Sequence, residues 1–384
     1  MGILRFLLAL AVAGRHAASW FGFSAGWILS GNRAVQIFYV ISGFLMAMIL
    51  NGKYADTPRG NWLFYSNRIL KIFVPYLVIL AASVGVCLLS KLMTGNGLML
   101  ESWFAETGSM SLSTWAFALL TNIFIIGQEW GFLLIYRAGS LFYSLQAFSE
   151  PPIGSQFTVI TPAWTLSIEL MFYALAPFIV RRHILLIAGL ALASCGFRFG
   201  AYRLGFYSEA TNYRFFPFEL SLFLYGALCF RLSTFLPKIN AGWAVAITVA
   251  ILTAVFIPGD LLNRQYQLYC LVGLVLPALF VFSQRNKWDR LLGDLSFPLY
   301  LVHWPIIAIA VALVRTVDPS SKAIAWPILA TVFSVFVSIL IDRYVVEPID
   351  KRRQARIQAD CHERPAEQVQ IVAGGPLSQR TVKT

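Results

Sequence analysis

The chain has 384 residues, of which 58% are hydrophobic and only 12% are charged. Soluble domains carry about 25% charged residues, so this composition excludes an ordinary soluble globular protein. The net charge of +12 comes from Lys and Arg clusters between apolar runs and from the C-terminal tail, which indicates cytoplasmic loops of a membrane protein and no nucleic-acid partner.

A helix that crosses a membrane needs about 20 mostly apolar residues, and ten segments of the sequence approach or reach this length. In chain order they are residues 4–20, 34–50, 72–92, 164–180, 184–200, 216–232, 243–258, 267–284, 294–315 and 324–343. We therefore predict an all-α fold, a polytopic membrane helix bundle of about ten transmembrane helices, with one membrane-embedded domain over residues 1–348. Residues 349–384 are polar and basic without apolar periodicity, which is typical of a disordered cytoplasmic tail.

The first segment allows a second interpretation, because residues 1–13 resemble a secretory signal peptide with one arginine, an apolar stretch and an A-x-A-like end. No obvious start of a mature protein follows, so we favour a retained helix. On that helix Arg5 and His16 are eleven residues apart. This spacing places them on one face within about 20° and separates them by about 16 Å along the axis.

Arg5 alone is also explained as a topology anchor, and His16 as a structural hydrogen-bonding group or a residue of the outer interface. The functional interpretation starts from depth, because a histidine far inside a membrane usually faces a cavity or a partner. A neutral imidazole there is suited to accept a proton from a hydroxyl, so His16 is a candidate general base.

Polar and small residues interrupt the next two segments. Gln36, Ser42 and Gly43 in the second segment favour close helix packing over chemistry. The third segment opens with Arg68 and Lys71, three residues apart and therefore on one face of a helix end. Two interpretations stay open for this pair: it anchors the topology, or it binds the phosphates of a cytoplasmic donor.

The apolar stretch 114–126 is short for a crossing, and a second stretch follows at 130–136. It forms either an additional crossing or a re-entrant segment. The positive-inside rule favours the second alternative, because a crossing would move the basic residues of later loops and of the tail to the outer side. We therefore expect residues 93–163 to form an outer loop and both termini to be cytoplasmic.

Two further ionisable side chains lie in apolar segments, Glu169 in the fourth and His303 in the ninth. An unpaired carboxylate inside a membrane is costly, so Glu169 either forms a structural ion pair or orients a catalytic histidine. Pro298 and Pro305 are expected to bend the helix near His303.

These motifs, taken in order, resemble those of the acyltransferase-3 family of integral membrane O-acyltransferases. Arg5 and His16 are similar to its Arg-x10-His motif, and residues 35–46 (VQIFYVISGFLM) to its second-helix motif. Residues 68–76 resemble its R-x-x-R-I-x-P-x-Y stretch, with Lys71 in place of the second arginine. The two remaining matches are residues 164–173 (WTLSIELMFY), similar to its W-S-L-S-x-E-x-x-F-Y block, and residues 295–306 (LSFPLYLVHWPI), similar to its S-Y-x-L-Y-L-x-H-x-P block.

The resemblance implies transfer of an acyl group, commonly acetyl, from acetyl-CoA to a hydroxyl of a carbohydrate or glycolipid of the cell envelope. With its WTLSIE variant the sequence looks similar to the exopolysaccharide and lipopolysaccharide O-acetyltransferases of the bacterial inner membrane, and no metal is expected. With that activity in view, the candidate roles are donor phosphate binding by Arg5, Arg68 and Lys71, proton removal or acyl transfer by His16, orientation of an imidazole by Glu169, and a second catalytic position at His303.

The main alternative is a secondary transporter or flippase for an envelope lipid or sugar. Such a carrier also needs embedded Arg, Glu and His residues to bind its substrate or a proton. The sequence shows no internal repeat of the kind found in many transporters, which favours the enzyme.

Overall fold

The computed structural model describes residues 1–24, 29–206, 208–234, 265–283, 286–317 and 323–362. The long helices in these ranges are α1 (Gly2–Trp20), α2 (Gly31–Gly52), α3 (Pro58–Thr94), α6 (Trp164–Ile179), α7 (Ile184–Arg203), α9 (Phe216–Ser233), α11 (Gln265–Ser283), α12 (Lys287–Val317) and α13 (Ala325–Ile341). In this part of the chain, 8 helical stretches are long and apolar enough to cross a bilayer, and α11 adds a shorter one. The predicted all-α polytopic bundle is confirmed, while the predicted segment 243–258 lies outside the described residues.

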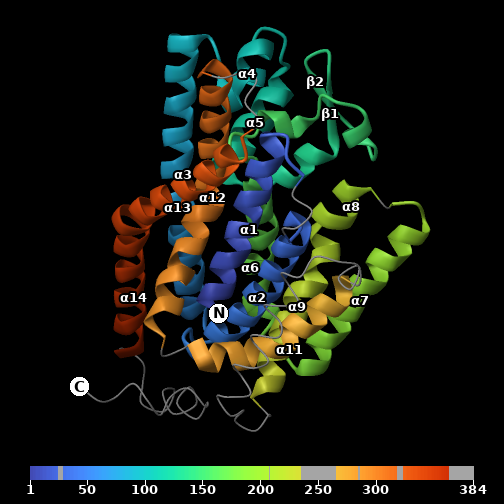
Figure 1. Cartoon of the computed structure of the whole chain (residues 1–384). Coiled ribbons are helices and arrows are strands. Elements are labelled where there is room, and N and C mark those ends of the chain that lie inside the picture. Colours follow the sequence, from blue (N-terminus) through green and yellow to red (C-terminus); the bar gives the residue numbers. More distant parts are fainter. Residues whose placement is uncertain (25–28, 207, 235–264, 284–285, 318–322, 363–384) are drawn as a thin grey trace.

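Helices α1, α2, α6 and α12 form the middle of the bundle, and α7 and α14 (Glu347–His362) lie at opposite flanks (Figure 1). Helix α1 packs along α12, and α2 packs along α9. Helix α7 buries only Ile187 and Ser194, as expected for a helix whose apolar surface faces lipid. The central helices are the ones that carry most of the predicted site residues.

Two glycines bring α2 and α9 into backbone contact. A Cβ atom at Gly43 would lie 1.8 Å from the carbonyl oxygen of Phe223, and one at Gly226 would lie 1.9 Å from that of Val40. Any larger residue at either position would force the two helices apart. The packing role expected of Gly43 agrees with this contact.

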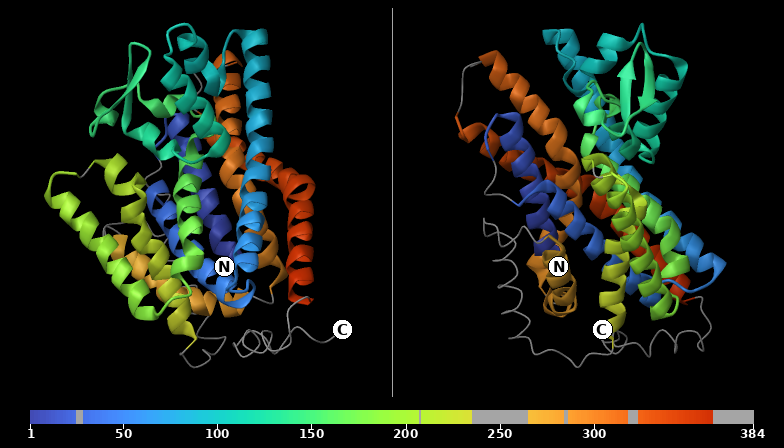
Figure 2. Two further views of the ribbon diagram at one scale, coloured as in Figure 1. Left: turned by 180° about the vertical axis from the view of Figure 1, so that it is seen from behind. Right: turned by 90° about the vertical axis from the view of Figure 1, so that its right-hand side faces the viewer.

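Residues 95–163 form a layer at the end of the bundle opposite the N-terminus (Figure 2). Its regular elements are α4 (Glu101–Glu106), α5 (Leu112–Phe124) and the antiparallel strands β1 (Leu134–Arg137) and β2 (Ser140–Tyr143). A further short helix, α8 (Glu209–Arg214), lies between α7 and α9 in the sequence and is not part of this layer. The 13 residues of α5 span about 20 Å, less than the roughly 30 Å of a hydrocarbon core. Helix α5 is therefore too short to cross the membrane, whereas the side of the membrane on which these residues lie stays a prediction. We call residues 95–163 the outer layer because they lie outside the helix bundle, at one of its ends.

Helix α13 continues through a π-helical turn (Asp342–Val346) into α14. The expected disordered tail from residue 349 is therefore wrong as far as His362, and residues 363–384 lie outside the described part. The sequence of α14 has no apolar face, so tertiary contacts hold it: the Arg356 guanidinium donates to the side chains of Ser66 and Asn67 on α3. These partners lie far away in the sequence, and no local pattern reveals them.

Candidate active site

A cavity of about 120 Å³ lies among the central helices, and four of the six predicted site residues line it: Arg5, Arg68, Lys71 and Glu169. Its wall is built by α1, α2, α3, α6 and α12. The mostly apolar lining is completed by residues of α2 and α12, among them Ser42, Tyr39, Ser296 and Tyr300. Residues separated by more than 200 positions in the chain therefore line one cavity.

The cationic side of the cavity comes from α1 and α3. Arg68 and Lys71 share one face of α3, as their spacing predicts, and Arg5 reaches the same cavity from α1. The guanidinium carbon of Arg68 lies 5.7 Å from the ring centroid of Phe64 and 5.7 Å from that of Tyr173. These cation–π contacts hold Arg68 at the cavity wall.

The carboxylate of Glu169 faces the cavity and is bound by two hydroxyls. Ser42 Oγ donates to Glu169 Oε1 at 2.5 Å, and the Tyr173 hydroxyl donates to the same oxygen. The hydroxyl oxygens of Ser42 and Tyr173 are 3.1 Å apart, within hydrogen-bond distance of each other. Among the residues that the structure describes, Glu169 thus contacts hydroxyls and not an imidazole, and Ser42 belongs to the cavity although its sequence context favoured packing alone.

The two predicted histidines form a pair. His16 Nδ1 lies 2.9 Å from His303 Nε2, and the two rings stack with centroids 5.2 Å apart. His303 is fully buried on α12, and its Nδ1 lies 3.2 Å from the carbonyl oxygen of Leu299. A carbonyl only accepts, so His303 Nδ1 carries the proton, and in a neutral pair His303 Nε2 accepts from His16 Nδ1–H. With these tautomers the Nε2 atom of His16 carries no proton, so its lone pair can accept one.

Tyr300 connects the cavity with the histidine pair. It lines the cavity, and its ring centroid lies 5.9 Å from that of His303, one turn further along α12. Its hydroxyl is fixed by Thr165 at 2.9 Å and by the carbonyl oxygen of Pro162 at 3.2 Å. The histidines therefore lie directly beyond one end of the cavity.

The other side of the pair faces the outer layer. The His16 ring packs edge-on against Trp304 with centroids 5.4 Å apart. Trp304 also lines a shallow depression together with Pro151, Pro152, Ile153, Ser155, Gln156 and Thr161. His16 thus lies between a cationic cavity toward the N-terminal end of α1 and an uncharged depression at the outer layer.

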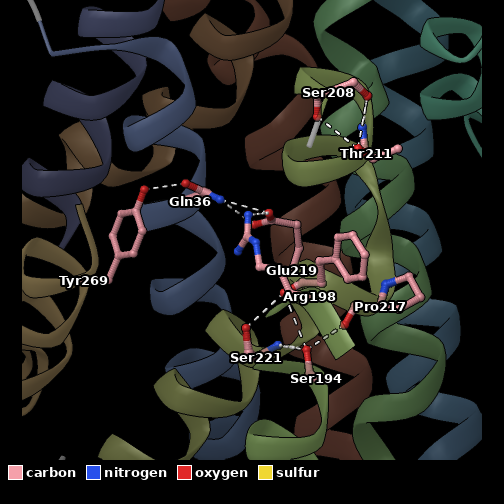
Figure 3. A network of polar contacts seen from close by, with 10 residues as sticks. Gln36, Ser194, Arg198, Ser208, Thr211, Pro217, Glu219, Ser221 and Tyr269 are labelled. Carbon is pink, nitrogen blue, oxygen red and sulfur yellow. Dashed lines mark hydrogen bonds and ion pairs between the residues drawn. The ribbon is translucent and has the colours of Figure 1, made fainter. Parts of the chain in front are cut away.

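A second polar network joins four helices, and the sequence interpretation did not single it out (Figure 3). Gln36 Nε2 donates to both oxygens of Glu219 at 2.9 and 3.0 Å, and Arg198 forms an ion pair with Glu219 at 3.0 Å. The Tyr269 hydroxyl donates to Gln36 Oε1. Glu219 and Arg198 each interrupt an apolar segment, the same signal that identified Glu169, so this rule could have found them.

The surroundings of Glu219 indicate a structural role. We call the network of Gln36, Arg198, Glu219 and Tyr269 the brace, because it connects four helices. The Glu219 side chain is completely buried, and within the described part of the chain its carboxylate is bound by Gln36 of α2 and Arg198 of α7. In the same region Ser194 Oγ donates to the carbonyl oxygen of Pro217 at 2.6 Å and accepts from the backbone of Ser221 (Figure 3). The network ties α2, α7, α9 and α11 together behind the cavity wall.

Two comparisons with known proteins gave a match to this chain. A family model for an acyltransferase domain, Acyl_transf_3, matches residues 1–343. The chain is 23% identical over 306 residues to the "Putative membrane-bound transacylase BcsY" of Komagataeibacter xylinus. The aligned region covers 75% of this chain and 69% of that protein. No solved structure matches the chain. Every residue that lines the cavity and both histidines lie within the matched range.

Proposed function

Because the chain belongs to the Acyl_transf_3 family of acyltransferases, we propose that it transfers an acetyl group from acetyl-CoA to a hydroxyl of a cell-envelope or exported carbohydrate. The single observation that carries this proposal is the histidine pair at the end of a cavity with three cationic side chains. A multi-pass membrane protein with this site takes an anionic donor from one side and presents it to a base.

The donor enters from the N-terminal end of α1. The cavity of about 120 Å³ has room for the acyl end of a thioester but not for a whole nucleotide, because sites for drug-sized ligands occupy about 300–1,000 Å³. The acyl group and the sulfur lie inside, and the phosphates stay near the mouth. Arg5, Arg68 and Lys71 hold them there, Arg as a bidentate donor and Lys as a point charge.

The cytoplasmic position of this mouth is part of the proposal. Loops that carry basic residues meet at this end of the bundle: Arg181 donates to the Tyr54 carbonyl oxygen at 3.0 Å, and Arg231 to Asn51 at 3.2 Å. Cationic loops remain on the cytoplasmic side of a bacterial inner membrane. Both termini are then cytoplasmic, and the layer of residues 95–163 with the depression at Trp304 faces the carbohydrate acceptor.

The transfer step uses the lone pair of His16 Nε2. The acceptor oxygen attacks the thioester carbonyl carbon while His16 Nε2 removes its proton, and a C–O bond forms. The tetrahedral intermediate collapses with cleavage of the C–S bond, and the thiolate takes the proton from His16 to leave as free CoA. His303 Nε2 stabilises the transient imidazolium by accepting from His16 Nδ1–H, so His303 is a positioning residue in this scheme.

The test compares variants that insert and express normally. We expect His16→Ala and Arg5→Ala to lose acetyl transfer from radiolabelled acetyl-CoA to the envelope glycan. His183→Asn is the matched control, because His183 lies at the exposed start of α7 and only accepts from the Leu185 backbone. Normal acetylation in both site variants would refute the proposal. A carrier, the alternative class, would release no free CoA from acetyl-CoA in detergent.

A further inference from the structure

Helix α14 folds back onto the start of α3, beside the mouth of the cavity. Arg356 donates to Ser66 at 2.9 Å and to Asn67 at 3.1 Å, and Arg59 lies 3.4 Å from Asp360. Ile357 packs against the main hydrophobic core. These contacts fix the position of a helix that lies beyond residues 1–343, the range that the family model matches.

Arg353 of α14 points into this junction. Its side chain is 9% exposed, and its guanidinium donates to Asp350 one turn earlier. Its Nε atom and that of Arg68 are both buried without a hydrogen-bond partner among the described residues. A buried donor left unpaired costs about 1–3 kcal/mol, so a site with two of them favours an acceptor-rich ligand.

Like charges gather around these two arginines. Arg353 and Arg68 both interact electrostatically with Lys71 and with Lys53, which follows the end of α2. Partial burial, Arg68 and Arg353 all lower the pKa of Lys53. Arg5 also interacts electrostatically with Lys71.

Carboxylates reduce this charge without cancelling it. Asp350 lies near Lys71, and Asp294, Asp342 and Glu347 are further acidic groups of this region. With Arg290 beside Asp294, six cations (Arg5, Lys53, Arg68, Lys71, Arg290 and Arg353) face five carboxylates (Glu169 in the cavity wall, Asp294, Asp342, Glu347 and Asp350), so a small positive excess remains. An anion at the mouth would relieve the repulsion between the cations.

We propose that Arg353, together with Lys53 and Arg68, forms a binding site for the phosphate monoester of the donor nucleotide, the 3′-phosphate of CoA. This inference rests on the proposed function and names the part of the donor that the site outside the cavity holds. The order of groups along acetyl-CoA matches the order of cations. The thioester occupies the cavity, the pyrophosphate follows at Arg5 and Lys71, and the 3′-phosphate is farthest from the thioester.

The charges match as well. A phosphate monoester carries about −1.5 to −2 at neutral pH, more than a diester or a single carboxylate. Arg68 lines the cavity, whereas Lys53 and Arg353 are absent from its wall. Arg353 on α14 and Lys53 at the end of α2 therefore extend the cationic surface outward from the cavity. The ribose of a bound donor would lie beside these two residues.

The test uses the full-length protein in detergent and measures binding of CoA and of 3′-dephospho-CoA by calorimetry. We expect the wild-type protein to bind CoA at least tenfold more tightly than 3′-dephospho-CoA. Arg353→Gln should weaken CoA binding about tenfold or more and leave 3′-dephospho-CoA binding within about twofold, which removes the discrimination. Lys53→Gln should act in the same direction, and Arg353→Lys should retain part of it. Arg352→Gln, at an exposed neighbouring position on α14, is the control and should bind both ligands as the wild type does.

Three results would overturn the inference. The first is equal binding of the two nucleotides by the wild-type protein, and the second is an equal loss for both nucleotides in Arg353→Gln, which would assign a purely structural role. The third is unchanged discrimination in Arg353→Gln with a lost dependence of activity on phosphatidylglycerol in nanodiscs, which would assign the site to a lipid headgroup. Acetyl transfer by the wild type is measured separately, so discrimination without transfer would refute the proposed function and leave this site standing.

Discussion

Replacement of His303 tests the histidine pair most directly. In His303→Phe the acceptor for His16 Nδ1–H at 2.9 Å is lost, while a flat ring of similar size keeps the position on α12 filled. An unpaired buried donor costs about 1–3 kcal/mol, and each 1.4 kcal/mol corresponds to a factor of ten in rate. If the cost falls on the productive orientation of His16, kcat should fall by about 5–150-fold, with little change in donor binding.

A conservative variant tests whether the hydrogen bond between His16 and His303, and not the imidazole ring of His303 itself, is what the reaction requires. In His303→Gln, the amide oxygen can accept from His16 and the amide nitrogen can donate to the Leu299 carbonyl oxygen, so we expect kcat within about tenfold of the wild type. The assay is acetyl transfer to the purified glycan at saturating acetyl-CoA, with CoA binding measured in parallel. Val302→Ala, a buried neighbour without a polar atom, controls for loss of packing. Wild-type kcat in His303→Phe would refute the assigned tautomers and the role of the pair.

The remaining predictions concern the brace, the helix contact and the donor site. Glu219→Ala leaves the guanidinium of Arg198 without its buried carboxylate and should destabilise the protein by about 3–5 kcal/mol, measured as a lower Tm in detergent, while Glu219→Gln should cost less. Gly43→Leu should prevent the contact of α2 with Phe223, so that little folded protein is recovered after size-exclusion chromatography; a normal yield would contradict the close approach. Lys71→Gln should raise the KM for acetyl-CoA by about tenfold or more, whereas Lys71→Arg should keep it near the wild-type value; equal KM values in both variants would exclude Lys71 from donor binding.

Local chemistry made much of the bundle predictable. Apolar runs of membrane-spanning length predicted most of the described helices to within a few residues, because a segment in lipid must satisfy its own backbone hydrogen bonds. Helix α3 differs, since it begins at Pro58 and not near residue 72, which places Arg68 and Lys71 inside the helix and not at its end. Helix α14 shows the limit of this reasoning, since its stability comes from Arg356 and its partners on α3 and not from its own pattern. The stretch 130–136 shows another limit, because its apolar residues end in a β-hairpin of the outer layer.

The candidate site likewise has features that the sequence predicts and features that only the tertiary structure shows. The placement of Arg5 and His16 on one side of α1, and of Arg68 and Lys71 on one face of α3, follows from the helical repeat and needs no tertiary information. The partner of Glu169 does not follow from it: the structure gives Ser42 and Tyr173, where the sequence suggested an ion pair or an imidazole. A polar residue in an apolar segment predicts that a partner exists but not which one.

The sequence by itself determined that this protein is a membrane helix bundle with cationic and imidazole groups on defined helix faces, because hydrophobicity and helical periodicity act within one segment. Only the tertiary structure decided that His16 meets His303, 287 positions away in the chain, and that Arg353 comes close to Arg68 and Lys71 of α3. Such contacts depend on how helices pack against one another, and packing is fixed by the shapes of both partners together, not by either sequence segment alone.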